Sequence, residues 1–468
     1  MSAVLSDGAV TPVEPAAEPV EVAAPSENTV KHIASTGSAT ECQATALVEA
    51  AAPSENTVKH VASTGSATEC SSEAPGFTVN AAVPPFPPEK RVYFDWAATA
   101  LPDKLPSEAP IPFGNPSSRH REGQLARTAL ENARERCAAV LGVEKNALYF
   151  TSGGTEANAI ALFSALLRPG SGRVVYSAAE HPSVRENCRV LERLGKPTGL
   201  IPVEQDGRVS EATLEKTLDK YPDTRIAAIM AVNNETGAVT DTSRLVALLR
   251  ARGGAPVHIH SDLVQAVGKV PVNLAAWDVD SASISAHKLG GPRGIGLLYL
   301  RKKLATLCSG GDQEGGVRPG TENTAGALAL AACLEGHAQS GVVTAEYAHA
   351  AARCQRIIAG LAAIPACSLI PRDRRAVSDT RFSPYIVQAA FKGVPGEVMV
   401  RALDDKGFAV STGSACSSTK AERPVLTAMG VDEDTRRGGI RISQGWSTAT
   451  EDIDRLLAAI TQVLALLS

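Results

Sequence analysis

The feature that most constrains the fold is an alternation of buried-strand patterns with helical patterns through the middle of the chain. Five apolar, β-prone segments predict strands, at 148–151, 173–177, 225–232, 257–261 and 281–285. Amphipathic segments such as 155–167 and 242–252 lie between several of them and predict helices. Such alternation is typical of a mostly parallel sheet covered by helices on both faces. We therefore predict an α/β fold with a large sheet domain.

The N-terminal part differs in composition from the rest of the chain. Residues 1–88 are rich in Ala, Pro, Glu, Ser and Thr, lack apolar periodicity, and hold ten acidic residues against two lysines. The segment 23–42 returns at 51–70 with one change, but two copies are too few to stack into a solenoid. We therefore predict that residues 1–88 form a disordered acidic tail with a tandem repeat.

The C-terminal part predicts a second, smaller domain. From about residue 336 the order changes to a helix at 345–363, then strands, a loop at 411–423 and a final helix at 450–467. This order is typical of an α+β domain. After the tail we expect three parts. Residues 89–114 form an N-terminal segment that joins the small domain. Residues 115–335 form the large domain, and residues 336–468 form the small domain.

Composition and charge exclude several classes of protein. Of the 468 residues, 44% are hydrophobic, which is enough for full cores, and the formal net charge is −4. This charge argues against general nucleic-acid binding, and no apolar run approaches the roughly 18 residues that a membrane span requires. The nine cysteines are scattered without a CxxC pair, so neither a disulfide framework nor a metal site is predicted. With no pattern of a targeting segment, we expect a cytoplasmic protein that binds neither nucleic acid nor membrane.

Lys288 stands where a predicted strand meets a run rich in glycine and proline. The strand at 281–285 delivers Ser285, His287 and Lys288 to its end, and the run that follows is typical of a loop. A lysine held in a loop beside phosphate-sized donors can anchor pyridoxal phosphate (PLP) as a Schiff base. The alternative is a solvated surface charge, as most lysines before such turns are.

Polar residues also follow the strands before this one. Gly154 and Thr155 lie between a strand and a helix, where backbone N–H groups can bind an anion, although an ordinary capped turn has the same pattern. His181 follows the next strand, at the edge of the sheet where ligands of open α/β folds bind, but a structural histidine is the alternative. Asn234 lies in a polar cluster that is also typical of a turn. Asp262 ends a further strand and can either face a pyridine nitrogen or cap a helix.

Taken together, these strand ends resemble the PLP-dependent cysteine desulfurases of the class V aminotransferase family, which have fold type I. The resemblance covers about 375 residues from Tyr93 to the C-terminus. The matching motifs occur in the family's order: FDWAAT (94–99), FGNPSSRH (113–120), FTSGGTEAN (150–158), EHPSV (180–184), VNNETGAV (232–239), SDLVQAVGK (261–269), SAHKLGGPRGIG (285–296), RPGTEN (318–323), STGSACSS (411–418) and IRIS (440–443).

The resemblance implies a role for each matching residue around PLP. Lys288 would bind the cofactor covalently, Asp262 would pair with the pyridine nitrogen, Gln265 would lie near the phenolic oxygen, and His181 would stack on the ring. The expected phosphate ligands are Gly154, Thr155, Ser285 and His287, with Thr321 reaching the phosphate of the other subunit in a homodimer. Asn234 and Arg441 would bind the substrate carboxylate, for which the forked donors of arginine are suited.

The resemblance also implies the reaction. L-Cysteine would be converted to L-alanine, with its sulfur carried by Cys416 as a persulfide and passed to an acceptor protein or scaffold, as in iron–sulfur cluster biosynthesis. The alternatives within enzymes are a selenocysteine lyase or another class V lyase or transaminase. The alternative of another class is a catalytically reduced sulfur-relay or binding protein.

Two departures from the family's pattern concern the active-site entrance. Trp96 stands where family members commonly have Asn, and a proline-rich segment at 100–112 replaces the helix expected there. Either change can reshape the entrance, so the sequence leaves the choice between cysteine and selenocysteine open.

Overall fold

The computed structural model describes residues 91–102, 111–168, 170, 172–252, 256–374, 379–413 and 423–467. All of them belong to the second of the two units into which the chain divides, Asn80–Ser468. The predicted tail at 1–88 lies outside the described residues. No helix in the described part of the chain is long and apolar enough to span a membrane. The division at 88, 114 and 335 stays a prediction.

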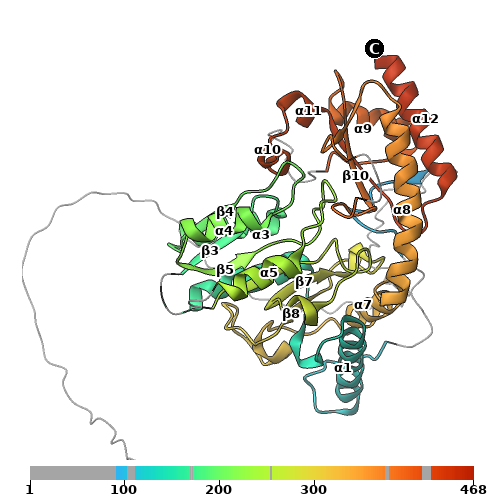
Figure 1. Cartoon of the computed structure of the whole chain (residues 1–468). Coiled ribbons are helices and arrows are strands. Elements are labelled where there is room, and N and C mark those ends of the chain that lie inside the picture. The colour runs from blue at the N-terminus through green and yellow to red at the C-terminus, as the bar shows by residue number, and fades with distance from the viewer. Residues whose placement is uncertain are drawn as a thin grey trace, which may run out of the picture. The chain divides into compact units, whose positions relative to one another are not determined.

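A seven-stranded sheet forms the centre of the larger part (Figure 1), with strand order β2-β8-β7-β6-β5-β3-β4. Its strands are β2 (Leu148–Thr151), β3 (Arg173–Ser177), β4 (Thr198–Ile201), β5 (Thr224–Ala228), β6 (His258–Asp262), β7 (Ser281–Ser285) and β8 (Gly296–Leu300). Five neighbouring strands, β4, β3, β5, β6 and β7, run parallel to one another, and β8 is antiparallel to both of its neighbours. The predicted α/β class with a mostly parallel sheet is therefore confirmed.

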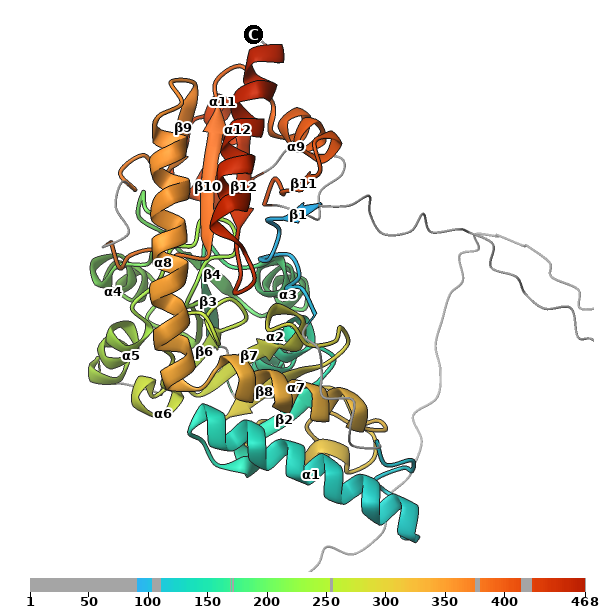
Figure 2. The same cartoon turned by 90° about the vertical axis from the view of Figure 1, so that its right-hand side faces the viewer.

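Helices cover both faces of this sheet, because successive strand residues alternate in direction. On β3, Val175 packs against the core formed with α1, α4, α5 and α7, whereas Val174 and Tyr176 pack against α2 and α3. Figure 2 shows α4 and α5 on one side of the strands and α2 and α3 on the other. The helices are α1 (Arg121–Leu141), α2 (Gly154–Phe163), α3 (Pro182–Arg193), α4 (Glu211–Lys220), α5 (Thr242–Ala251), α6 (Leu274–Trp277) and α7 (Thr324–His337).

A second core lies around a three-stranded antiparallel sheet of order β12-β10-β9. Its elements are α8 (Ser340–Ala362), β9 (Cys367–Ile370), β10 (Ile386–Phe391), α9 (Gly396–Asp405), α10 (Pro424–Ala428), α11 (Glu433–Gly438), β12 (Gly439–Ser443) and α12 (Thr450–Leu467). The N-terminal strand β1 (Val92–Tyr93) pairs in parallel with β11 (Phe408–Ala409). The chain thus packs its first described strand against its C-terminal part, and the residues that follow β1 run toward the large sheet.

The loops that follow β3, β5, β6 and β7 lie at one edge of the large sheet, since these strands are parallel neighbours. Ligands of open α/β sheets bind at this edge. His181, Asn234, Asp262 and Lys288, which were singled out in the sequence, end or follow these strands.

Candidate active site

One cavity of about 600 Å³ lies at this edge of the sheet. Ten of the twelve predicted site residues line it: Gly154, Thr155, His181, Asn234, Asp262, Gln265, Ser285, His287, Lys288 and Arg441. Thr321 is exposed and does not line the cavity. Cys416 lies outside the described residues. Gly413 and Pro424, on either side of the segment that contains Cys416, both line the cavity.

Lys288 occupies a short turn directly after β7. Its Nζ donates to the carbonyl oxygens of Ala97 and Ala98, each at 2.6 Å. Burial lowers the pKa of Lys288 to about 8, with a further contribution from the charge of Arg441. A neutral amine is the nucleophilic form of lysine, so this environment favours covalent chemistry at Nζ.

Asp262 is the last residue of β6 and is almost completely buried. Its Oδ1 accepts from the backbone N–H of Val264 at 3.0 Å, and its Oδ2 accepts from Asn158 Nδ2 at 2.8 Å. Both oxygens are thus fixed by donors, and the carboxylate lines the cavity. The arrangement suits a carboxylate that faces a cationic nitrogen of a ligand.

His181 caps the N-terminus of α3. Its Nδ1 accepts from the Ser183 backbone N–H at 3.1 Å and contacts Ser183 Oγ at 2.8 Å. Because Nδ1 is engaged in the cap, Nε2 is the nitrogen left for proton exchange with a bound molecule. Burial lowers the pKa of His181, so the neutral ring prevails near pH 7.

The N-terminus of α2, with Ser285 and His287, forms a part of the cavity where an anion can approach the backbone closely. Gly154 opens α2, and a Cβ there would lie 2.6 Å from Val264 Cγ2, which leaves no room for a side chain. The N-terminus of this ten-residue helix favours negative charge. Ser285 and His287 lie nearby on the same cavity, and burial lowers the pKa of His287 to about 4. His287 is therefore a neutral hydrogen-bonding group.

Arg441 on β12 brings a buried cation to the cavity from the second core. Its Nη2 pairs with Asp95 Oδ1 at 2.8 Å, and its Nη1 donates to the Asn234 carbonyl oxygen at 2.8 Å. Its Nε is buried and has no hydrogen-bond partner in the described structure. A buried donor without a partner costs stability, which fits a group that receives an anionic ligand.

Residues 92–456 match the class V aminotransferase family. The chain belongs to this family. It is 36% identical over 393 residues to the cysteine desulfurase IscS of Dictyoglomus turgidum, a match that covers 80% of this chain and 95% of the relative. The cysteine desulfurase IscS of Methanosarcina thermophila is 34% identical over 389 residues, covering 80% and 92%.

Solved structures resemble the chain in the same way. A NifS-like protein has a TM-score of 0.70 and 30% identity, covering 81% of this chain and all of that one. DndA from Streptomyces lividans has a TM-score of 0.58 and 31% identity, covering 71% and 92%. The predicted membership of the class V aminotransferase family, with fold type I, is confirmed.

Class V aminotransferases depend on PLP, and the residues of this cavity fit that cofactor. The glycine-lined helix N-terminus suits a phosphate, the Asp262 carboxylate suits a pyridinium nitrogen, and the Lys288 amine suits covalent attachment to an aldehyde. The predicted PLP dependence therefore agrees with both the family and the chemistry of the donors.

Several residues that support this aminotransferase-family site have no role assigned from the sequence. Glu180 is buried with one oxygen unpaired, and burial raises its pKa well above the usual range, with Asp262 adding to the effect. Lys269 is also buried and donates to Gln265 Oε1 at 2.8 Å. Asn158 contacts Asp262. All three lie inside the matching motifs, but only the distances show what they contact.

Trp96 does not reach the cavity. Its ring is 2% exposed and packs edge-on against Trp446 with centroids 5.0 Å apart, while Nε1 donates to the Tyr93 carbonyl oxygen. Its neighbours Ala97 and Ala98 line the cavity instead, and their carbonyls accept from Lys288. Trp96 therefore anchors the backbone that orients Lys288. Most of the proline-rich segment, 103–110, lies outside the described residues.

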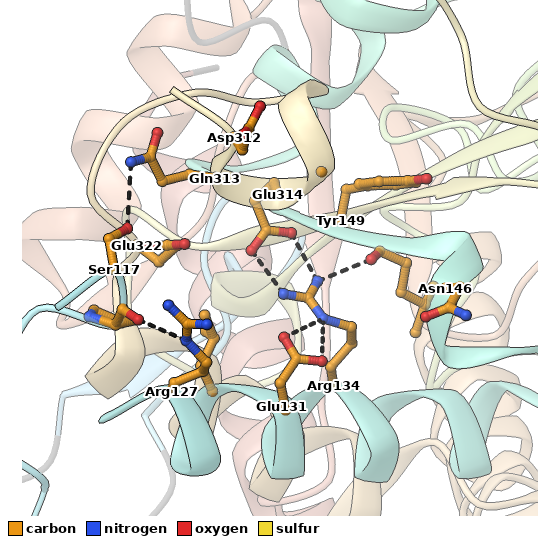
Figure 3. A pocket seen from close by; sticks show the side chains of 14 residues that line it. Ser117, Arg127, Glu131, Arg134, Asn146, Tyr149, Asp312, Gln313, Glu314 and Glu322 are labelled. Carbon is orange, nitrogen blue, oxygen red and sulfur yellow. Dashed lines mark hydrogen bonds and ion pairs between the residues drawn. The ribbon is translucent and has the colours of Figure 1, made fainter. Parts of the chain in front are cut away.

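A second cavity of about 530 Å³ lies beside α1 (Figure 3). Arg134 extends from α1 to Glu314, and two nitrogens of its guanidinium contact the two carboxylate oxygens at 2.7 and 2.8 Å. Glu314 also accepts from the Phe150 backbone N–H at 2.7 Å, and Arg134 donates to the Leu148 carbonyl oxygen. The buried charges here satisfy one another, which is typical of a structural ion pair.

Proposed function

We propose that the chain is a cysteine desulfurase that removes sulfur from L-cysteine, leaves L-alanine, and carries the sulfur on Cys416 as a persulfide. The observation that supports this most is one cavity lined by the Lys288 amine, the Asp262 carboxylate and the buried Arg441 guanidinium. Curated relatives that match most of the chain are named cysteine desulfurases.

The residues proposed to hold PLP act on three parts of the cofactor. Lys288 holds it covalently, Asp262 keeps its pyridine nitrogen protonated, and Gln265 and His181 contact the ring. The proposed phosphate ligands are Gly154, Thr155, Ser285 and His287, with Thr321 of the second subunit of a homodimer. When bound, PLP withdraws electrons from the α-carbon of the amino acid.

The proposed substrate ligands are Arg441 and Asn234. Arg441 Nε is a buried donor with no partner among the residues that the structure describes, so the substrate carboxylate would supply an acceptor. Lys288 Nζ, whose pKa is lowered to about 8, can accept the proton of the α-carbon near neutral pH. His181 is neutral and carries its proton on Nε2, so it can donate a hydrogen bond to the bound molecule.

The sulfur-transfer step requires a second thiol. The Cys416 thiolate attacks the sulfur of bound cysteine, an S–S bond forms, and the C–S bond breaks with its electron pair left on the substrate carbon, which is then protonated to give alanine. The position of Gly413 on the cavity wall supports this assignment, because Cys416 follows it by three residues.

The remaining parts of the proposal concern the setting of the enzyme. We propose a homodimer in the cytoplasm that passes sulfur to an acceptor protein or scaffold, as the biosynthesis of iron–sulfur clusters requires. The buried thiols of Cys137, Cys188 and Cys354 suit a reducing compartment.

The test uses Cys416→Ser, with Cys308→Ser as a matched control because Cys308 is an exposed thiol away from the cavity. Cys416→Ser is expected to keep the visible absorbance of bound PLP but to yield no persulfide and little sulfide from L-cysteine. Cys308→Ser is expected to behave as the wild type. Mass spectrometry of the wild type after L-cysteine treatment should place one added sulfur on the peptide that contains Cys416.

Normal turnover by Cys416→Ser would contradict the proposal, as would an added sulfur on another cysteine. Turnover of selenocysteine alone would indicate a selenocysteine lyase, and keto-acid products would indicate a transaminase. A wild type that binds PLP without any turnover would indicate a sulfur-relay or binding protein.

A further inference from the structure

A continuous chain of buried side chains runs behind the cavity, from Asp262 into the sheet. Asn158 on α2 is completely buried and donates through Nδ2 to Asp262 Oδ2 at 2.8 Å. Its Oδ1 contacts His260 Nε2 at 2.8 Å. His260 Nδ1 contacts Ser281 Oγ at 2.8 Å, and Ser281 Oγ contacts His258 Nε2 at 2.8 Å. Four hydrogen bonds therefore link the cavity carboxylate to the interior of the sheet.

The protons along this chain follow from the carboxylate at its end. An ionised Asp262 only accepts, so the amide nitrogen of Asn158 faces it and the amide oxygen faces His260. His260 must then carry its proton on Nε2. Burial lowers the pKa of His260 to about 4, so the ring is neutral and its Nδ1 accepts from Ser281. Each donor thus meets one acceptor.

A second branch leads from Asn158 through Ser183 to His181, which also lines the cavity. Asn158 Nδ2 also donates to Ser183 Oγ at 2.8 Å. Ser183 Oγ has one proton, which it can give to His181 Nδ1 at 2.8 Å. The Ser183 backbone N–H donates to the same nitrogen. His181 Nδ1 is therefore an acceptor twice, and the proton of the neutral ring is on Nε2, the nitrogen left for a ligand.

Asn158 is the only described residue that hydrogen-bonds to both Asp262 and Ser183. If the amide turned over, its oxygen would face the Asp262 carboxylate, and both branches would lose their donor. The two ends of an amide have the same shape, so packing does not decide between the two orientations. The Asp262 carboxylate sets the orientation because it only accepts, and the His260 Nε2–H, which needs an acceptor, holds the amide oxygen in that orientation.

We propose that Asn158 is a positioning residue that couples the Asp262 carboxylate to the hydrogen bond between the Ser183 hydroxyl and His181, and that His260 holds its amide in the orientation that the carboxylate requires. The proposal deepens the proposed function, since it rests on Asp262 and His181 contacting PLP. It assigns a role in cofactor binding to residues that do not themselves contact the ligand. His260 does not line the cavity.

The test compares two variants of His260 in the full-length protein. His260→Gln keeps an N–H donor near the position of Nε2, whereas His260→Leu has a similar volume but no donor. The dissociation constant of PLP is measured by visible absorbance after removal and readdition of the cofactor. His260→Leu is expected to weaken PLP binding about ten- to hundredfold, the effect of losing a hydrogen bond to a charged group. His260→Gln is expected to stay within about threefold of the wild type.

A second measurement follows the imidazole of His181 directly. Nitrogen NMR of the PLP-free protein should find the His181 proton on Nε2 in the wild type and in His260→Gln. In His260→Leu the proton should stay on Nε2, because the Ser183 backbone N–H still donates to Nδ1, but the Nδ1 resonance should shift as the Ser183 hydroxyl loses its fixed donor. Asn158→Ala should weaken PLP binding at least as much as His260→Leu, since both branches lose their donor.

Equal PLP binding by the two His260 variants would overturn the proposal, whether both bind as the wild type or both lose affinity with the same fall in melting temperature. A wild-type His181 proton on Nδ1 would also overturn it. Because the readouts are PLP affinity and ring tautomer, a protein that binds PLP but fails to desulfurate cysteine would refute the proposed function without deciding this inference.

Discussion

The two cavities differ in how their buried charged side chains are paired. Beside α1, Arg134 and Glu314 form a bidentate pair whose oxygens and nitrogens have partners, although Glu322 nearby leaves one oxygen unpaired. At the sheet edge, the only acceptors of Lys288 Nζ among the described residues are carbonyl oxygens, and Arg441, although its Nη2 pairs with Asp95, has no described partner at Nε. The charges of Arg134 and Glu314 thus neutralise each other, whereas the Lys288 amine contacts no carboxylate in the described part of the chain.

This difference separates a pair that stabilises the fold from a buried amine that is suited to covalent chemistry. When one residue of a buried ion pair is replaced, the fold loses stability, because the other charge is left buried without a partner. A buried amine without a carboxylate partner has a lowered pKa, and that is what makes Lys288 a nucleophile near neutral pH. The amine of Lys288, which meets no carboxylate among the described residues, thus marks the reactive cavity, and the Arg134–Glu314 pair is structural.

Lys288→Ala should give the largest effect on activity. Without Nζ there is no covalent bond to PLP, so turnover should fall below detection while the fold stays largely intact. Borohydride reduction followed by peptide mapping measures this directly, with the pyridoxyl group expected on Lys288 of the wild type. A reduced pyridoxyl group on another lysine, such as Lys269, would show that the reactive amine is misassigned.

Arg134→Met should give the largest effect on stability while sparing the active site. It leaves Glu314, whose side chain is 1% exposed, as a buried carboxylate without its cation. We expect a loss of about 3–5 kcal/mol in the free energy of unfolding, measured with urea, and an unchanged PLP absorbance. The double variant with Glu314→Gln should recover most of this loss. If Arg134→Met were as stable as the wild type, the ion pair beside α1 would not stabilise the fold, and the contrast with the active site would fail.

The sequence predicted the sheet because its strands are short, apolar and separated by amphipathic segments. Patterns at 148–151, 173–177 and 281–285 coincide with β2, β3 and β7. The strand predicted at 225–232 is shorter, since β5 ends at Ala228, although Ile229 and Ala231 still donate to the carbonyl oxygens of His260 and Asp262. Two strands of the sheet were missed. β4 has little apolar pattern, and β8 begins at Gly296, in a run that indicated a loop.

Most lining residues of the active site could also be predicted from the sequence, because they end or follow strands of the large sheet, whereas Arg441 on β12 was identified only from the family motif. The supporting residues could not be predicted in this way. Lys269 follows Gln265 by four residues, but the contact between them depends on the turn after β6, and nothing in local composition indicates that Nζ is buried. Asn158 likewise gains its role only from Asp262, which lies on a different element 104 residues away.

Lys269 offers the smallest and most specific test of the contrast between the cavities. Its Nζ is buried with Gln265 Oε1 as acceptor, and burial lowers its pKa to about 7, with the charges of Lys288 and Arg441 adding to the effect. The unfolded chain has the ordinary lysine pKa of about 10.4, so between this value and pH 7 the unfolded state binds a proton that the folded state does not.

The sign of the pH dependence follows from that difference. The folded state loses stability as the pH falls from about 10 toward 7, by at most about 1.4 kcal/mol per pH unit for this one group. Lys269→Met keeps the length of the side chain and removes the titrating amine, so urea unfolding should show a flatter pH profile and a free energy of unfolding at pH 7 that is higher by about 1 kcal/mol or more. Lys216→Met on the exposed face of α4 is the matched control and should leave the profile unchanged. An unaltered profile for Lys269→Met would mean that Lys269 is paired like Arg134, and the two cavities would then not differ in this respect.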